Sequence, residues 1–128
     1  MINEDIILPF KITNLYLGFA ECNGILKILQ NHLLIEYEIK DGIVNLVKSG
    51  IKQIKIPLDN VINIEYKKNI FLSKIFLSLK TLKGLSDFPL KENNLILIIP
   101  RKYSELAKVY CSTVNLKIAE NKLNKLEN

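Results

Sequence analysis

The side chains that could carry out acid–base chemistry are few in this chain. His32 is the only histidine, and a general base needs a positioned partner, which a lone histidine in a polar turn does not have. Glu36 and Glu38 are two residues apart on an expected strand, so they share a face on which carboxylates are usually solvated. We therefore predict no catalytic residues and a protein that is not an enzyme.

The same scarcity argues against metals and cofactors. Cys22 and Cys111 lack metal-ligand spacing and a second histidine, so we expect no metal site and two reduced packing residues. The five glycines are scattered and form no phosphate-binding loop, so we expect no cofactor. No apolar run reaches the ~20 residues of a membrane span. The acidic start, residues 1–5, is unlike a signal peptide, which predicts a cytoplasmic location.

Composition indicates one folded domain with an uneven charge. The chain has 128 residues, 48% hydrophobic and 24% charged. Residues 1–66 contain 6 basic and 8 acidic residues, whereas residues 67–128 contain 12 basic and 5 acidic ones. A basic half attracts anionic partners, but the Lys and Ile surplus also fits an AT-rich genome, and lysines keep surfaces soluble. We do not expect nucleic-acid binding, because no aromatic series alternates with the lysines.

Short strands separated by turn residues fill positions 19–100. Period-two alternation places Ile62 and Ile64 inward on one strand, and Phe71 and Ile75 inward on the longest one. Residues 1–18 are expected to be irregular because Pro9 interrupts their apolar run, and residues 43–50 fit either a strand extension or a loop. The predicted strands are residues 24–29, 33–40, 51–58, 61–66, 71–82, 85–90 and 95–99, the last covered on both faces.

The apolar period changes to that of a helix at residues 101–124. The predicted core stripe of this helix is Tyr103, Leu106, Ala107, Tyr110, Val114 and Ile118. We therefore predict a single mainly β domain over residues 1–128. About seven antiparallel strands form a bent sheet or partly open barrel, and one C-terminal helix caps its open end.

Residues 54–65, with an Ile-Pro-Leu element, a polar turn and an Ile-x-x-Ile-Glu-like ending, resemble the bacterial pleckstrin-homology-like (PH-like) and GRAM-like families. The apolar strand 95–99, followed by Pro100 and a helix, is similar to the end of those domains. The resemblance covers roughly residues 19–120 and implies a seven-strand sheet with a capping helix. It does not fix a function. The turn at residues 30–32 lacks the basic cluster that phosphoinositide-binding relatives use.

One candidate membrane-binding tip lies between lysines. Ile70, Phe71 and Leu72 can dip into an anionic bilayer surface if they are exposed, with lysines on both sides. The alternative, which we favour from the sequence, is that they begin the next strand and enter the core. The residues of this candidate tip are Lys67, Lys68, Ile70, Phe71, Leu72 and Lys74.

A second apolar stripe lies opposite the core stripe of the helix. Its members are spaced 7, 3, 4 and 3 residues apart, as in a helix–helix seam, although an exposed, frayed tail would show the same pattern. Its residues are Val109, Leu116, Ala119, Leu123 and Leu126. The leading hypothesis is a binding or assembly module that forms homo-oligomers or binds a protein partner. The alternative is a module that binds an anionic membrane surface.

Overall fold

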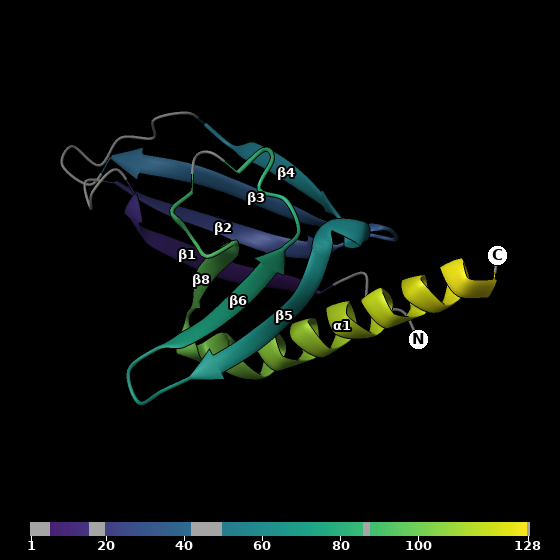
Figure 1. Cartoon of the computed structure of the whole chain (residues 1–128). Coiled ribbons are helices and arrows are strands. Elements are labelled where there is room, and N and C mark those ends of the chain that lie inside the picture. Colours follow the sequence, from purple (N-terminus) through teal and green to yellow (C-terminus); the bar gives the residue numbers. More distant parts are fainter. Residues whose placement is uncertain (1–5, 16–19, 42–49, 86–87, 128) are drawn as a thin grey trace.

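The fold is an antiparallel sheet followed by one long helix. The computed structural model describes residues 6–15, 20–41, 50–85 and 88–127 (Figure 1). The prediction of a mainly β chain with one C-terminal helix is confirmed. The elements are β1 (Ile7–Leu15), β2 (Ala20–Ile28), β3 (His32–Asp41), β4 (Lys52–Pro57), η2 (Leu58–Asn60), β5 (Val61–Lys68), β6 (Ser73–Leu79), β7 (Leu90–Lys91), β8 (Asn94–Ile99), η3 (Arg101–Tyr103) and α1 (Ser104–Glu127).

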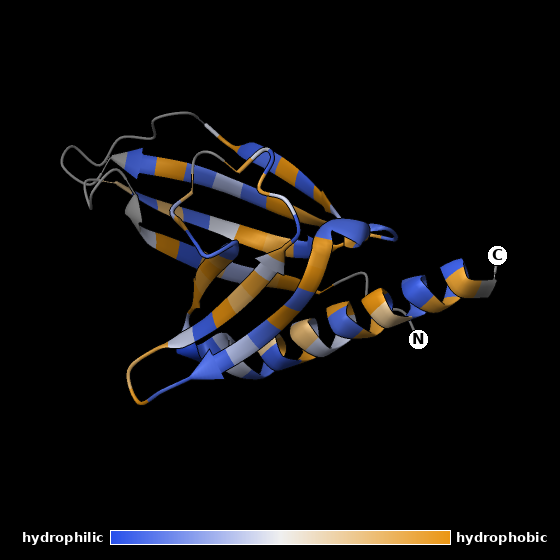
Figure 2. Cartoon of the chain, in the orientation of Figure 1, coloured by the Kyte–Doolittle hydropathy of each residue, from blue (hydrophilic) through white to orange (hydrophobic). Residues whose placement is uncertain are grey.

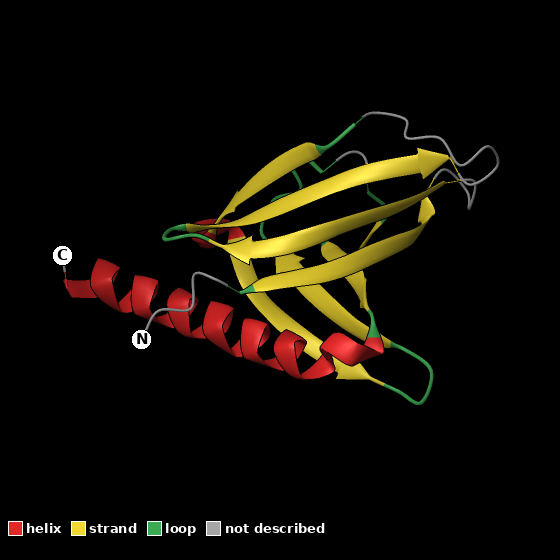
Figure 3. Cartoon of the chain, turned by 180° about the vertical axis from the view of Figure 1, so that it is seen from behind, coloured by secondary structure: helices red, strands yellow, loops and turns green. Residues whose placement is uncertain are grey.

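The strands form one sheet in the order β4-β3-β2-β1-β8-β6-β5, with the two-residue β7 pairing with β8. Every described pairing is antiparallel. The edge strands β4 and β5 are joined in sequence through η2 but do not pair with each other. The sheet therefore bends strongly and stays open, and α1 runs along one side of it (Figure 3).

The first strand was not expected from the sequence. Residues 7–15 form β1, which pairs with β2 along most of its length and with β8 at Lys11. The prediction of an irregular segment over residues 1–18 is therefore wrong for this part. Pro9 cannot donate a hydrogen bond to a neighbouring strand. It pairs with Ile25 of β2, and the described bridge to β8 is at Lys11, two residues later, so no described pairing with β8 needs a donor from Pro9.

The core lies on the inner face of the bent sheet. On β6 and β8 every second residue is buried. Hydrophobic and hydrophilic residues alternate along β3 (Figure 2), whereas residues 95–99 of β8 are apolar throughout. Leu95, Leu97 and Ile99 face the core, whereas Ile96 and Ile98 are only half-buried on the outer face. The expectation that residues 95–99 are covered on both faces is therefore wrong.

A β-bulge changes the inward face of β5. The register with β6 shifts between Val61 and Asn63, so Val61 is buried and Ile62 is 49% exposed. The alternation expected from the sequence placed Ile62 inside, which is wrong for this reason. β5 also continues through Lys67 and Lys68, where a break was expected.

Two other strand predictions have different outcomes. Of the strand predicted at residues 85–90, residues 86–87 lie outside the described residues, and Leu85, Phe88 and Pro89 are not in a strand. Leu85 and Phe88 are buried in the core, and only Leu90 pairs, as part of the two-residue β7. Most of the segment at residues 43–50 lies outside the described residues. The strand predicted at 51–58 is β4, although Ile51 lies before it and is 76% exposed.

The helix stripe predicted to face the core does so. Ala107, Tyr110, Val114 and Ile118 are buried, and Tyr103 and Leu106 pack against them. α1 lies mainly against β5 and η2 and reaches β1. The hydroxyl of Tyr110 donates a hydrogen bond to the Lys27 carbonyl oxygen of β2, at 3.1 Å. The helix thus covers the open side of the sheet.

Asn115 of α1 closes part of the β5 edge. Its Oδ1 accepts a hydrogen bond from the Ile64 amide at 3.2 Å, and its Nδ2 donates one to the Ile64 carbonyl at 2.8 Å. One side-chain amide therefore satisfies both backbone groups of an edge-strand residue, as a further strand would.

Candidate functional site

The candidate tip is the turn of the β5–β6 hairpin, and it projects from the fold. Ile70 is 76% exposed, Phe71 is 77% exposed and Leu72 is 39% exposed. The last strand pair before the turn is Lys68 with Ser73, so none of the three belongs to β6. The expectation that they enter the core, with Phe71 on the inner face of the strand, is wrong. We call Ile70, Phe71 and Leu72 the apolar tip.

Local hydrogen bonds hold the apolar tip in its exposed conformation. The Asn69 side-chain oxygen accepts hydrogen bonds from the amides of Phe71 and Leu72, at 2.8 and 2.7 Å. The backbone N–H of Asn69 donates a hydrogen bond to the Leu72 carbonyl oxygen at 2.9 Å. Asparagine at this position favours such a turn because its short side chain bonds the backbone two and three residues on. The apolar side chains are therefore directed outward by a defined turn.

Arg101 of η3 supports the turn from the side. Its Nη1 donates a hydrogen bond to the Ile70 carbonyl at 2.7 Å. The apolar tip is thereby joined to the segment that connects β8 to α1. Residues 67–74 and 98–102 contain five basic residues and no acidic one: Lys67, Lys68, Lys74, Arg101 and Lys102.

A row of basic residues crosses the outer face of the sheet just behind the turn. Lys67 is the register partner of Lys74, Lys74 of Ile98, and Ile98 of Lys11. Register partners share a face and neighbouring strands lie ~4.8 Å apart, so the row spans about 15 Å. We call Lys67, Lys74 and Lys11, with Ile98 between them, the basic row. Lys67 and Lys74 face each other directly, and the Lys67 ammonium lies 4.7 Å from the centre of the Phe76 ring. Like charges opposite each other destabilise a strand pair, and a nearby anion would relieve this repulsion further.

A cleft of about 350 Å³ lies behind the apolar tip. Basic groups reach it from two elements, Lys11 on β1 and Arg101 on η3. No acidic residue lines it. Its lining residues are Lys11, Thr13, Phe71, Leu72, Ser73, Ile98, Ile99, Pro100 and Arg101. Sequence reasoning missed Lys11 and Arg101 as site residues. The one signal for Arg101 was that it is the only arginine beside 17 lysines.

Beneath the turn, three hydroxyl groups join the hairpin to the start of α1. The Tyr66 hydroxyl and Ser73 Oγ are 2.9 Å apart, and Ser73 Oγ and Ser104 Oγ are 3.2 Å apart. Burial opposes ionisation of Tyr66, but the hydroxyls of Ser104 and Ser73 and the charges of Lys68 and Lys108 outweigh it and lower its pKa. This chain of hydroxyls fixes the base of the hairpin on the helix.

The stripe on the outer side of α1 is exposed, as its position opposite the core stripe predicts. Val109, Leu116, Leu123 and Leu126 are 49%, 60%, 58% and 83% exposed, and Ala119 is exposed too. No described element packs over it, and the last turns of α1 extend past the sheet (Figure 1). Asp59 of η2 accepts hydrogen bonds from Lys125 and Asn121 on the opposite side of α1.

The remaining sequence candidates do not converge on a reactive site. The Glu36 carboxylate accepts a hydrogen bond from Gln53 at 2.7 Å and lies 3.1 Å from Lys27, and these contacts lower its pKa. A general acid needs the opposite shift. The Glu38 carboxylate lies 3.9 Å from the Lys40 ammonium. His32 lies at the end of the β2–β3 turn, and its Nε2 is buried without a hydrogen-bond partner.

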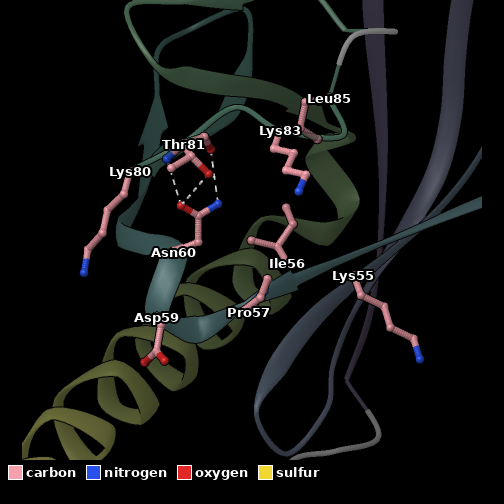
Figure 4. A pocket seen from close by; sticks show the side chains of 9 residues that line it. All are labelled: Lys55, Ile56, Pro57, Asp59, Asn60, Lys80, Thr81, Lys83 and Leu85. Carbon is pink, nitrogen blue, oxygen red and sulfur yellow. Dashed lines mark hydrogen bonds between the residues drawn. The ribbon is translucent and has the colours of Figure 1, made fainter.

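A hollow of about 670 Å³ lies between β4–η2 and the segment after β6. Three lysines line it, but Figure 4 shows Lys83 pointing into it while Lys80 and Lys55 point away from each other. The Asn60 side chain is hydrogen-bonded to the segment after β6, because its Oδ1 accepts a hydrogen bond from the Thr81 backbone amide at 2.8 Å. The lysines of this hollow therefore do not converge on one position.

Within the described ranges, no group of three or more His, Cys, Asp or Glu side chains is placed to hold a metal ion. Among the described helices, none combines the length and apolar character of a membrane-spanning segment. Neither protein-family models nor curated proteins nor solved structures give a match to this chain.

Proposed function

We propose that this chain is a non-catalytic module that docks on the surface of an anionic membrane through the apolar tip and the basic row. The single observation that carries the proposal is the apolar tip, with Ile70 and Phe71 about three-quarters exposed on a hydrogen-bonded turn. Exposed apolar side chains in such a group are typical of an interaction surface.

The order of groups along the hairpin matches the layers of a bilayer surface. The apolar tip is outermost. The pair Lys68–Ser73 comes next along the hairpin, and the pair Lys67–Lys74 follows it. When the tip enters the acyl boundary, the lysines therefore lie at the depth of the phosphates. Full burial of one apolar side chain of the tip in the bilayer contributes ~1.5–3 kcal/mol to the binding free energy. Each nearby Lys or Arg contributes ~1 kcal/mol on an anionic leaflet. A single signal gives only marginal binding, and stable anchoring takes two such signals together.

Co-sedimentation with phosphatidylcholine vesicles, with and without phosphatidylglycerol, tests the proposal. We expect binding that needs phosphatidylglycerol and falls at least about tenfold with Phe71→Asp, because an apolar contact worth ~1.5–3 kcal/mol is replaced by a charge. Ile51→Asp is the matched control, since Ile51 is 76% exposed but lies outside the tip. Equal losses in the two variants, or no binding at low salt, would refute membrane docking through this tip.

We propose pairing of two copies through the outer stripe of α1 as the second candidate function. The observation that favours it is the symmetric spacing of the stripe. Ala119 follows Leu116 by three positions, Leu123 follows Ala119 by four, and Leu126 follows Leu123 by three. An antiparallel pair around a two-fold axis therefore sets Leu116 opposite Leu126 and the small Ala119 opposite Leu123. Each contact occurs twice, so the stripe is complementary to itself.

Sedimentation equilibrium tests the pairing. Leu123→Lys is expected to convert a dimer into a monomer, because it places two like charges in the seam. Asn124→Lys is the matched control, since Asn124 is exposed on the same turn but points about 100° away from Leu123. A monomer at high concentration before any substitution rules out this second function.

The PH-like and GRAM-like assignment is likewise our proposal. It is supported by the order of elements, an open antiparallel sheet followed by one capping helix. The cytoplasmic location is also proposed, and it is supported by two buried cysteine thiols in a chain of this size.

A further inference from the structure

We propose that the cleft behind the apolar tip binds the phosphate of one phospholipid headgroup, held between Arg101 and Lys11. This inference rests on the proposed membrane docking and names the lipid group that the site recognises. The cleft opens beside Phe71 and Leu72, so insertion of the tip brings headgroups to its mouth.

Arg101 has the geometry of a phosphate ligand. It is the only arginine among 18 basic residues, and the planar guanidinium binds phosphate through two parallel hydrogen bonds, which lysine does not. Its hydrogen bond from Nη1 to the Ile70 carbonyl holds the group at the base of the tip. Within the described ranges no other acceptor is assigned to it, so its remaining N–H donors are open to a ligand.

Lys11 supplies the second charge from the other side. It is exposed on β1, and its register partner Ile98 lies on the floor of the cleft. Thr13 lies two residues further along the same face of β1 and adds a hydroxyl group. Leu72, Ile98 and Pro100 supply apolar walls for the glycerol and the first acyl carbons. The two charges and the apolar walls together fit a phosphate ester with a hydrocarbon tail better than a free inorganic anion.

The volume and charge of the cleft agree with this ligand. About 350 Å³ is at the small end of the range for ligand sites, which suits one small headgroup. Because no acidic residue lines the cleft, its two cations have no carboxylate of the same site to neutralise them.

An NMR titration of the full chain with soluble dihexanoyl phosphatidic acid tests the site. We expect saturable shifts at Lys11, Thr13, Ile98 and Arg101. Glycerol 3-phosphate should bind more weakly at the same residues, and inorganic phosphate more weakly still. Equal binding of inorganic phosphate would show a general anion site and overturn the lipid assignment. Shifts confined to Lys67 and Lys74 would also overturn it, because the phosphate would then lie on the hairpin alone.

Substitutions separate this site from general charge attraction. Arg101→Gln is expected to weaken the binding of dihexanoyl phosphatidic acid at least about tenfold. Arg101→Lys should recover only part of this affinity, because lysine keeps the charge but loses the bidentate contact. Lys102→Gln is the matched control, since it removes the same charge from the next residue, which does not line the cleft. Equal effects of Arg101→Gln and Lys102→Gln would refute the site. Lys11→Gln provides a second test if Arg101→Gln disturbs the turn.

Vesicle binding distinguishes failure of this inference from failure of membrane docking. If vesicle binding depends on Phe71 but Arg101→Gln and Lys102→Gln are equal, docking stands and the headgroup site falls. If no vesicle binds, docking through the tip falls, and the headgroup site, which rests on it, is overturned as well.

Discussion

Asn115→Ala tests how the helix seals the sheet. The substitution removes the hydrogen bonds of 3.2 and 2.8 Å between the Asn115 side chain and the backbone of Ile64, a residue that is 1% exposed. Each bond contributes ~0.5–1.5 kcal/mol net, so the pair contributes about 1–3 kcal/mol. Alanine offsets part of this loss, by ~0.5 kcal/mol, because it favours the helix more than asparagine.

Thermal unfolding monitored by circular dichroism measures the effect. For a chain of 128 residues one kcal/mol corresponds to ~3–6 °C, so a net loss of about 0.5–2.5 kcal/mol should lower Tm by about 2–15 °C. Asn124→Ala, on an exposed position of the same helix, should instead leave Tm unchanged or raise it slightly. The Ile64 amide should also exchange with solvent faster in Asn115→Ala. An unchanged Tm together with unchanged exchange at Ile64 would refute the reasoning.

Three further outcomes follow from the structure. Gly24→Ala should lower the free energy of unfolding by about 1–3 kcal/mol in urea titrations, because its new Cβ would meet the backbone carbonyl oxygen of Glu36 and lie 2.7 Å from Phe10 Cζ; a neutral Gly24→Ala would contradict the packing. The hydrogen bonds from Lys125 and Asn121 lower the pKa of folded Asp59, so its stabilisation is present above the ordinary aspartate pKa and is lost as the pH falls through the lowered value; the protection of amides in the last turns of α1, taken relative to their intrinsic exchange rates, should then fall, and Asp59→Asn should abolish that pH dependence. Burial raises the pKa of the Cys111 thiol to about 12, so iodoacetamide at pH 8 should label it only after unfolding, as peptide mass spectrometry would show; rapid labelling of the folded chain would contradict its burial.

Periodicity predicted the parts of the fold in which one face is buried. The core stripe of α1 and the β2–β3 hairpin follow from residue types alone. In both, residues at equivalent positions of the helix or strand period lie on the same face and therefore share one environment. The errors occur where the backbone leaves that repeat. The bulge after Val61 rotates Ile62 outward, and Pro9 interrupts the apolar pattern of β1, which pairs mainly with β2 and bridges to β8 at Lys11.

The candidate sites were predicted as segments but not as a surface. The sequence indicated the apolar residues between lysines, yet the side-chain oxygen of Asn69 turns Phe71 outward, and alternation gives no sign of this. Lys11 and Arg101 come together only because β1 pairs with β8, a contact between the two ends of the chain. Pairings at such separation cannot be derived from local pattern.

The position of β8 in the sheet has a consequence for how the chain folds during synthesis. β1 to β4 form one meander and β5 with β6 a hairpin, and β8 lies between β1 and β6 as the strand that joins them. Until residues 94–99 leave the ribosome, the outer edge of β1 and the free edge of β6 have no partner. Such unpaired apolar edges invite pairing between nascent chains. Insertion of β8 is therefore the late, long-range step of folding, and chaperones that shield strand edges should act on this chain before that step.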